Sequence, residues 1–450
     1  MTDTEYAPSP LAASAPKPLS GRFQTPGDKA ISHRVLILAA LAVGTSRLKG
    51  LLEAEDVAAT AAALRQLGVR IETENGTTIV EGLGVRGLLA PEGTLDMGNS
   101  GTGARLLMGV LAPYDFASRF TGAPTLTRRP MGPLLDALGA IGTVLEASDN
   151  GHLPITLRGP DLALPIRHTM TAPSDQIKSA LLLAGLHSPG KTIIVEPVPT
   201  RDHTEKLLAG FGAEITTTID DAVGATITLT GLAELRPQAI TVPGDPSTAA
   251  YAIVAALTVP GSDVLVENVQ INPTRTGLID TLLEMGGDIQ FINQRETGGE
   301  IVADLRVRSS RMKGVMVNAA HAAQMLDDIP ILAVAAAYAQ GDTRIAALAE
   351  LRDQECDRLA ATAAGLMANG VAASVDGDDL AIQGQGTVAG GGMAQSFGDH
   401  RIVMSMLVLG LGSTSPASVD DATAVAASFP GFVTALTALG AQFEPVKGQS

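Results

Sequence analysis

The feature that most constrains the fold is a repeat of roughly 70 residues. Six times a run of helical periodicity ends in glycine and is followed directly by a short β-type segment. These glycines are spaced 70 to 84 residues apart, at Gly68, Gly142, Gly212, Gly286, Gly370 and Gly440. Glycine just past the last helical turn is the expected residue for a left-handed C-terminal cap. A period this long suits a small α/β unit rather than a solenoid repeat. The sequence therefore predicts an α/β protein of six related units.

A second repetition groups the six units into two sets of three. The phrase Pro-Gly-Asp precedes an apolar helical run at residue 26 and again at residue 243. Three glycine-capped units lie between these turns and three lie after the second turn. We therefore expect two pseudo-equivalent domains. The first would comprise residues 27–243, and the second residues 21–26 together with 244–450.

Composition excludes several classes of protein. A chain of 450 residues with 45% hydrophobic residues can bury two sizeable cores. A formal net charge of −16 and only 3% aromatic residues argue against partners such as nucleic acid or an anionic membrane. The single cysteine, Cys356, excludes a disulfide framework, and the histidine spacing does not suggest a metal site. We expect a soluble, cytoplasmic protein in which residues 1–20 are a disordered tail.

Against this acidic background, cations and small residues recur where helices are predicted to start. Lys29 and Arg34 fall in the first two turns after the first Pro-Gly-Asp, near backbone N–H groups that have no intrahelical partner. The glycine-rich stretch GNSGTG, which contains Gly101, would let an anion approach the backbone closely, although a simple tight turn would explain it equally well. Arg129 precedes Pro130, which suits rigid, bidentate recognition of a carboxylate or phosphate.

Further candidates follow along the chain, and each has a structural alternative. Ser174 and Gln176 open another predicted helix, where a simple N-cap would explain the serine. Asp327 precedes a long apolar run, as either a cap or a base. The remaining charged candidates are Arg201, Glu355, Arg358 and Arg401. So many cations in an acidic chain indicate a site for small polyanions.

One familiar motif is interpreted as a coincidence. Residues 185–192, GLHSPGKT, match the nucleotide-binding P-loop pattern. A P-loop needs a strand before it and a helix after it, whereas here the helical composition comes first. We expect a helix-to-strand turn instead.

Seven motifs, in this order and spacing, resemble those of the 5-enolpyruvylshikimate-3-phosphate (EPSP) synthases: PGDK.ISHR, GN.GTG.R, RPMG, TRDHTE, PGDPS, D..P and E.DR. The resemblance covers about residues 21–430. It implies two domains, each of three βαβαββ units around a pseudo-threefold axis. It also implies transfer of the enolpyruvyl group of phosphoenolpyruvate to the 5-hydroxyl of shikimate 3-phosphate, by a monomer that needs no metal or organic cofactor.

The resemblance assigns roles to the candidate residues. Asp327 would accept the 5-hydroxyl proton, and Glu355 and Lys29 would move protons at C3 and at the leaving phosphate. Residues expected to hold phosphoenolpyruvate are Lys29, Arg129, Arg358 and Arg401, with Gly101 giving room and Gln176 lying between the substrates. Residues expected to hold shikimate 3-phosphate are Arg34, Ser174, Arg201 and the residue at position 354.

This chain departs from the family pattern at three positions on the sugar-phosphate side. Ala30 replaces a serine, Asp175 replaces a small residue, and Gln354 replaces a lysine. Losing one charge-assisted hydrogen bond costs about 1.5–3 kcal/mol. Two alternatives to an active synthase therefore stay open. One is a catalytically impaired homologue that binds ligands, and the other is a UDP-N-acetylglucosamine enolpyruvyl transferase, a family that uses a loop cysteine.

Overall fold

The computed structural model describes residues 9–147 and 151–446. The chain divides into two compact units. The first unit comprises Gly27–Pro243 and Glu296–Glu300. The second comprises the chain up to Pro26, Gly244–Arg295, and the chain from Ile301 onward. The main boundaries therefore fall at the two Pro-Gly-Asp turns.

The first unit contains three four-stranded sheets among its described residues. In each sheet the first two strands pair parallel, and the other neighbouring strands pair antiparallel. In sheet order, the first is β14 (Ala239–Thr241), β3 (Val43–Lys49), β5 (Thr77–Leu83) and β4 (Arg70–Glu74). The second is β6 (Leu95–Asp96), β7 (Ala117–Thr121), β9 (Ile155–Arg158) and β8 (Val144–Ala147). The third is β10 (Arg167–Thr169), β11 (Lys191–Glu196), β13 (Gly224–Thr230) and β12 (Ile215–Asp220).

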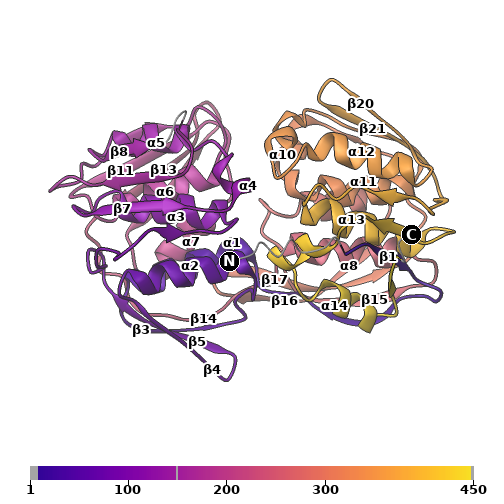
Figure 1. Cartoon of the computed structure of the whole chain (residues 1–450), viewed down its shortest axis with the longest axis horizontal. Helices are drawn as coiled ribbons and strands as arrows, with labels where there is room; N and C mark the ends of the chain where they lie inside the picture. The colour runs from indigo at the N-terminus through magenta and orange to yellow at the C-terminus, as the bar shows by residue number, and fades with distance from the viewer. Residues whose placement is uncertain (1–8, 148–150, 447–450) are drawn as a thin grey trace, which may run out of the picture. The chain divides into compact units, whose positions relative to one another are not determined.

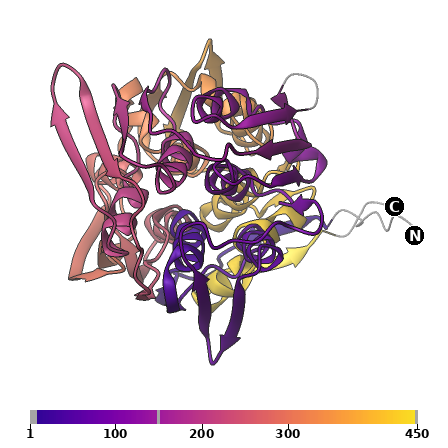
Figure 2. The same cartoon turned by 90° about the vertical axis from the view of Figure 1, so that its left-hand side faces the viewer.

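Helices connect these strands. The helices of the first unit are α1 (Lys29–Leu41), α2 (Glu55–Gln66), α3 (Gly101–Leu111), α4 (Pro124–Thr127), α5 (Gly132–Gly139), α6 (Asp175–Gly185) and α7 (His203–Gly210). Figure 1 labels them, and Figure 2 shows the same unit with several helices seen end-on and the strands toward its periphery. The order β6–α3–β7–α4–α5–β8–β9 is a complete βαβαββ unit, as expected, with the short helix α4 added before α5.

The second unit repeats this plan in its described residues. Its sheets, in strand order, are β16 (Asp288–Thr297), β17 (Glu300–Arg308), β15 (Asp263–Gln270) and β2 (Ser20–Gln24); β18 (Met316–Val317), β19 (Gln340–Ile345), β21 (Asp379–Gln385) and β20 (Ala372–Asp376); and β22 (Met393–Ala394), β23 (Ala417–Val419), β1 (Leu11–Ser14) and β24 (Gln442–Pro445). Its helices are α8 (Pro246–Thr258), α9 (Gly277–Glu284), α10 (Ala319–Ala323), α11 (Ile329–Ala337), α12 (Arg358–Ala368), α13 (His400–Gly412) and α14 (Phe432–Ala438), with 3-10 turns η2 (Leu326–Asp328), η3 (Ala349–Asp353) and η4 (Thr423–Ala427). The predicted α/β fold class is confirmed.

All six predicted cap glycines have a positive φ, between 83° and 111°. At Gly68, for example, the N–H of Val69 returns to the carbonyl of Leu64, which is the bond pattern of a Schellman cap. The predicted turn at residues 185–192 is also confirmed, because α6 ends at Gly185 and β11 begins at Lys191.

The expectation of a disordered tail over residues 1–20 is wrong for residues 9–20, and residues 1–8 lie outside the described part of the chain. Strand β1 lies between β23 and β24 and pairs antiparallel with both. Ala13 and Leu19 are buried in the core of the second unit. A four-residue strand flanked by prolines carries little periodic signal, and its stability comes from partners more than 400 residues away.

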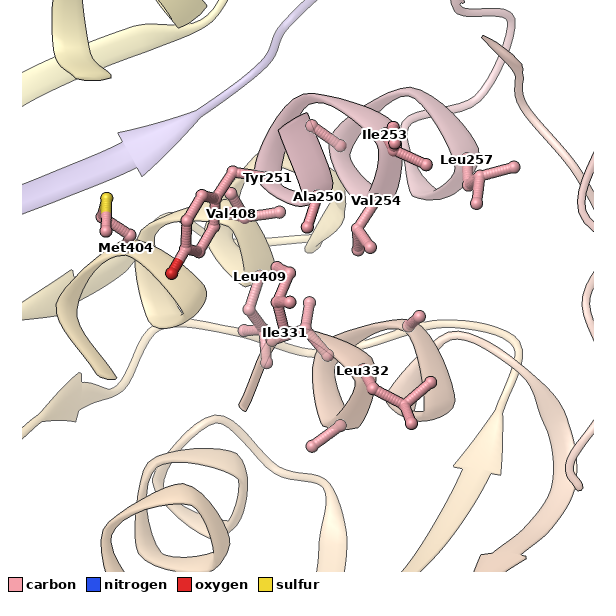
Figure 3. Packing of buried hydrophobic residues seen from close by; sticks show 14 of the residues in the cluster. Ala250, Tyr251, Ile253, Val254, Leu257, Ile331, Leu332, Met404, Val408 and Leu409 are labelled. Atoms are coloured by element: carbon pink, nitrogen blue, oxygen red, sulfur yellow. The ribbon is translucent and has the colours of Figure 1, made fainter. Parts of the chain in front are cut away.

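Each unit has three helices that are buried along almost their whole length. In the first unit these are α1, α3 and α6, and in the second α8, α11 and α13. Figure 3 shows Tyr251 and Val254 of α8 facing Ile331 of α11 and Val408 of α13. A helix that is apolar on all sides belongs in a core. The predicted site residues Lys29, Gly101 and Gln176 lie in the first turns of the buried helices of the first unit.

Glycine is required where a strand approaches the end of a buried helix. A Cβ at Gly384 of β21 would lie 2.4 Å from the carbonyl oxygens of Ala336 and Ala339, at the end of α11. We expect Gly384→Ala to lower the free energy of unfolding by about 1–3 kcal/mol, because the backbone must move apart. Urea unfolding followed by circular dichroism would measure this.

Gly210 in α7 is the matched control. A Cβ there meets no described atom within 4 Å. Gly210→Ala should leave the urea midpoint unchanged or raise it, since alanine favours helix by up to about 1 kcal/mol. Equal loss of stability in both variants would contradict this account.

Candidate active site

Arg34 is the centre of a buried polar cluster in the first unit, where it is 2% exposed. Its Nε donates to Thr204 Oγ1 at 2.7 Å, and its Nη1 donates to the carbonyl of Ala30 at 3.0 Å. Its Nη2 donates to Ser179 Oγ at 2.8 Å and to Asp175 Oδ2 at 3.1 Å. The guanidinium therefore joins α1 to α6 and α7, and its orientation is fixed by the protein itself.

Asp175 is held as a carboxylate in this cluster. Burial alone would raise its pKa, but the neighbouring charges of Arg34 and Arg201 more than offset burial, so its pKa is lowered. Asp175 is thus half of an ion pair with Arg34, rather than an unbalanced charge. Its neighbour Ser174 is the N-cap of α6 and accepts from the N–H of Ile177. Ser174 therefore has the capping function that was the alternative to a binding role.

Lys29, the first residue of α1, is paired with α2. Its Nζ lies 2.8 Å from Asp56 Oδ2, and both side chains are largely buried. Asp56 had no predicted role, because an acidic residue in the first turn of a helix is a common feature. Only the packing of α2 beside α1 identifies it as the partner of Lys29.

Two arginines converge on Gly101. A Cβ at this position would lie 2.9 Å from Arg129 Nη1 and 3.0 Å from Arg105 Nη1. Arg105 Nη1 also donates to Gln176 Oε1 at 2.9 Å, and Gln176 Nε2 donates to Thr102 Oγ1 at 3.3 Å. Burial, with repulsion from Arg129, lowers the pKa of Arg105 to about 10, so it stays charged at neutral pH.

Sequence reasoning missed Arg105 as a site residue. It belongs to the motif GN.GTG.R, but it received no role. Its position one helical turn after Gly101 was the available signal, because residues four apart lie on one face of a helix. The structure therefore connects Gly101, Arg105, Arg129 and Gln176 in one group.

A second cluster forms around Arg358 in the second unit. Arg358 Nε donates to Asp399 Oδ2 at 2.7 Å, and its Nη2 is paired with Glu355. Its Nη1 lies 3.6 Å from Asp327 Oδ1. Arg401 Nη2 lies at the same distance from that Asp327 oxygen. The structure thus gathers the four predicted residues Asp327, Glu355, Arg358 and Arg401.

Asp399, another residue that the sequence did not single out, organises this second cluster. It is fully buried, and its Oδ1 caps α13 by accepting from the N–H of Arg401 at 2.8 Å. Its Oδ2 binds Arg358. One carboxylate thereby fixes both the start of α13 and an arginine of α12.

Gln354 and Cys356 lie on either side of Glu355. Gln354 Nε2 donates to the carbonyl of Glu350 at 3.2 Å. Cys356 is half-buried, and burial, with the nearby Asp399 carboxylate, raises the pKa of its thiol to about 12. This thiol is protonated at neutral pH and is a weak nucleophile.

The described residues contain one group of side chains of metal-ligand type, Asp202, His203 and Glu300. Lys206 Nζ lies 2.9 Å from Glu300 and 3.2 Å from Asp202. An ammonium therefore already balances these carboxylates.

Within the described ranges, none of the helices combines the length and apolar character of a membrane span.

The roles of Asp399 predict a stability effect. Asp399→Asn keeps an oxygen that can cap α13 but removes the charge opposite buried Arg358. Breaking a buried ion pair should lower the free energy of unfolding by about 3 kcal/mol, measured by urea denaturation.

Asp357→Asn is the matched control. Asp357 also caps a helix, α12, and pairs with an arginine, Arg352, but this pair is partly exposed. Its loss should cost under about 1 kcal/mol. Similar losses in both variants would contradict the special role of Asp399.

Comparison with known proteins adds independent information. The family model described as EPSP synthase (3-phosphoshikimate 1-carboxyvinyltransferase) matches residues 13–436. The chain is 52% identical over 429 residues to the 3-phosphoshikimate 1-carboxyvinyltransferase of Chelativorans sp. (strain BNC1), covering 95% of this chain and 96% of the relative. It is also 52% identical over 444 residues to the protein of the same name from Methylobacterium sp. (strain 4-46), covering 98% and 99%.

Solved structures of enolpyruvyl-transferring enzymes also match this chain. The structure of EPSP synthase from Acinetobacter baumannii matches with a TM-score of 0.86 and 37% identity, covering 97% of this chain and 100% of that one. The enolpyruvyl transferase NikO from Streptomyces tendae matches with a TM-score of 0.77 at 19% identity, covering 98% of this chain and all of that one, which shows likeness of fold.

Proposed function

Because this chain belongs to the EPSP synthase family, we propose that it is a working 3-phosphoshikimate 1-carboxyvinyltransferase. It would transfer the enolpyruvyl group of phosphoenolpyruvate to the 5-hydroxyl of shikimate 3-phosphate and release phosphate. The observation that carries the proposal is the cluster of Asp327, Glu355, Arg358 and Arg401 in the second unit. Four charged residues from three separate sequence motifs lie in contact there. A protein with only a structural role would not require this concentration of charge.

Holding two anionic substrates is the first task of such an enzyme. Each substrate carries a phosphate and a carboxylate, so fixed cations must offset their repulsion. Lys29, Arg129, Arg358 and Arg401 would hold phosphoenolpyruvate, with Gln176 between the substrates. Arg34, Ser174 and Arg201 would hold shikimate 3-phosphate. Gln176 is already oriented by Arg105 and Thr102, which limits the rearrangement needed on binding.

Proton transfer is the second task. The 5-hydroxyl oxygen would bond to C2 of phosphoenolpyruvate as Asp327 takes the hydroxyl proton and C3 gains a proton from Glu355 or Lys29. A C3 proton would then return to Glu355 or Lys29 as the C2–O bond to phosphate breaks, which restores the double bond and releases phosphate. Asp327 Oδ1 lies 3.6 Å from an Nη atom of Arg358 and of Arg401, so the two arginines hold the carboxylate that would accept the proton.

The three departures bear on the sugar-phosphate side. Asp175 balances the charge of Arg34, which weakens its attraction for an incoming anion. Ala30 offers a backbone carbonyl to the same guanidinium but no hydroxyl. We therefore expect weaker binding of shikimate 3-phosphate than the family pattern would give, with the chemistry intact.

The nucleotide-sugar alternative is not favoured. That chemistry would use a cysteine, and the thiol of Cys356, the single cysteine of the chain, has a pKa of about 12. A cytoplasmic monomer that acts on small anions, without cofactor, nucleic acid or membrane, is consistent with the net charge of −16.

The direct test is phosphate release by the purified protein. We expect release only when both substrates are present at millimolar concentration, compared with each substrate alone. Asp327→Asn should reduce the rate by at least about a hundredfold, since it removes the proton acceptor. No turnover above the blanks would contradict the proposal. Ligand binding by calorimetry would then favour the impaired homologue.

Position 354 offers a second test. Gln354→Lys should lower the KM for shikimate 3-phosphate about ten- to a hundredfold, and the KM for phosphoenolpyruvate much less, because a charge-assisted hydrogen bond is restored. Asp175→Ala should act in the same direction by freeing Arg34 for the substrate. Steady-state kinetics with each substrate varied in turn would measure both.

Gln383→Lys is the control for added charge, since Gln383 is exposed on β21. It should leave both KM values unchanged. If Gln354→Lys behaves like Gln383→Lys, then residue 354 does not face the sugar phosphate.

A further inference from the structure

A fully buried hydrogen bond joins α1 to α2 beside the candidate site. His33 Nδ1 and Thr60 Oγ1 are 2.8 Å apart, and both residues are 0% exposed. We propose that Thr60, through His33, is a positioning residue that seats the GNSGTG turn against the helix of Lys29 and Arg34. This inference rests on the proposed function, because it assigns the pair to the same site.

Two contacts spaced one helical turn apart join α1 to α2. Lys29 and His33 are four residues apart on α1, and their partners Asp56 and Thr60 are four residues apart on α2. Residues at this spacing share one face of a helix. The two contacts therefore form a ladder that fixes both the rotation and the sliding of α2 relative to α1. The contact between Lys29 and Asp56 is an ion pair, and the contact between His33 and Thr60 is a neutral hydrogen bond.

Thr60 also contacts the start of α3. A Cβ at Gly103 would lie 2.5 Å from Thr60 Oγ1 and 2.8 Å from Ser100 Oγ. The hydroxyl of Thr60 therefore rests against the backbone of the first turn of α3. Ser100 Oγ caps this turn by accepting from the N–H of Gly103. The position of Thr60 thus sets where α3 can begin.

The first turn of α3 carries residues of the candidate site. Gly101 lies two residues before Gly103 and faces the guanidinium groups of Arg105 and Arg129. Thr102, between the two glycines, accepts from Gln176. A small shift of this turn would displace Gly101 and Thr102, and with them the arginine and glutamine side chains that they contact. Misplacement of such groups is costly to the rate even when binding persists.

The charge state of His33 suits this role. Burial of the ring lowers its pKa to about 3, although the carboxylate of Asp56 acts in the opposite direction, and repulsion from Lys29 and Arg34 adds to the lowering. The ring is therefore neutral across the working pH range and adds no charge to a site rich in cations. Nε2 of His33 has no hydrogen-bond partner in the part of the chain that the structure describes. Its bond to Thr60 is then the contact that orients the ring.

Two substitutions at position 60 test the inference. Thr60→Val keeps the shape but removes the hydroxyl, and we expect kcat/KM for phosphoenolpyruvate to fall about five- to tenfold, the loss of one neutral hydrogen bond. Thr60→Ser keeps the hydroxyl and should retain most of this activity. Hydrogen exchange measured by mass spectrometry should show faster exchange at residues 99–104 in the valine variant and parent-like exchange in the serine variant.

Thr192→Val is the matched control. Thr192 is also buried with its hydroxyl against a glycine, Gly185, where a Cβ would lie 2.7 Å away, but it lies on β11 outside the proposed site. It should change neither kcat/KM nor exchange at residues 99–104. If Thr192→Val lowers kcat/KM as much as Thr60→Val does, then the effect of Thr60→Val reflects general packing and not the position of the GNSGTG turn.

The outcomes separate this inference from the proposed function. If the parent protein shows no turnover, the proposed function is contradicted. The role of Thr60 is then still decided by hydrogen exchange at residues 99–104. Unchanged exchange at residues 99–104 in Thr60→Val overturns the positioning role, whatever the activity. Loss of activity in Thr60→Ser as large as in Thr60→Val also overturns it, because the hydroxyl would then be irrelevant.

Discussion

The candidate site depends on arginines that are buried in pairs with carboxylates. Arg34 with Asp175 in the first unit, and Arg358 with Asp399 in the second, are each almost inaccessible to solvent at the guanidinium. A buried guanidinium without a partner would cost several kcal/mol. The carboxylates therefore let each unit keep fixed positive groups in place before any ligand arrives. Groups fixed in advance need little reorganisation during a reaction.

The repeated architecture explains where these groups stand. Each unit buries three apolar helices, and the first turns of such helices are the points where backbone N–H groups lack intrahelical partners. The two Pro-Gly-Asp turns are equivalent in form, since Asp28 caps α1 and Asp245 caps α8. Their next residues differ, because Lys29 follows the first turn and Pro246 follows the second. The repeat thus gives α1 and α8 equivalent N-terminal caps, but of these two helices only α1 begins with a cation.

The structure changes the interpretation of two departures from the family pattern, Asp175 and Gln354. Asp175 appears in the sequence as an added negative charge beside an anion site, yet its charge is neutralised by Arg34. Under the proposed function its effect would be indirect, since Asp175 would compete with the substrate for the guanidinium of Arg34. Gln354 has no such compensation for the lysine that it replaces, because its amide donates to a backbone carbonyl. Under the proposed function, these two positions would weaken binding of the sugar phosphate by different physical routes.

The sequence by itself determined the repeat, the helix caps and the candidate cations, because these are local properties. A glycine such as Gly68 adopts its positive φ for reasons contained within one helical turn, and Lys29 follows its turn directly. The partners of Lys29 and Arg358, namely Asp56 and Asp399, carry no local signal that distinguishes them from ordinary caps. Strand β1 was missed for the same reason, since its stability comes from β23 and β24. Only the tertiary structure decided these pairings, because they depend on how helices and strands far apart in the chain pack together.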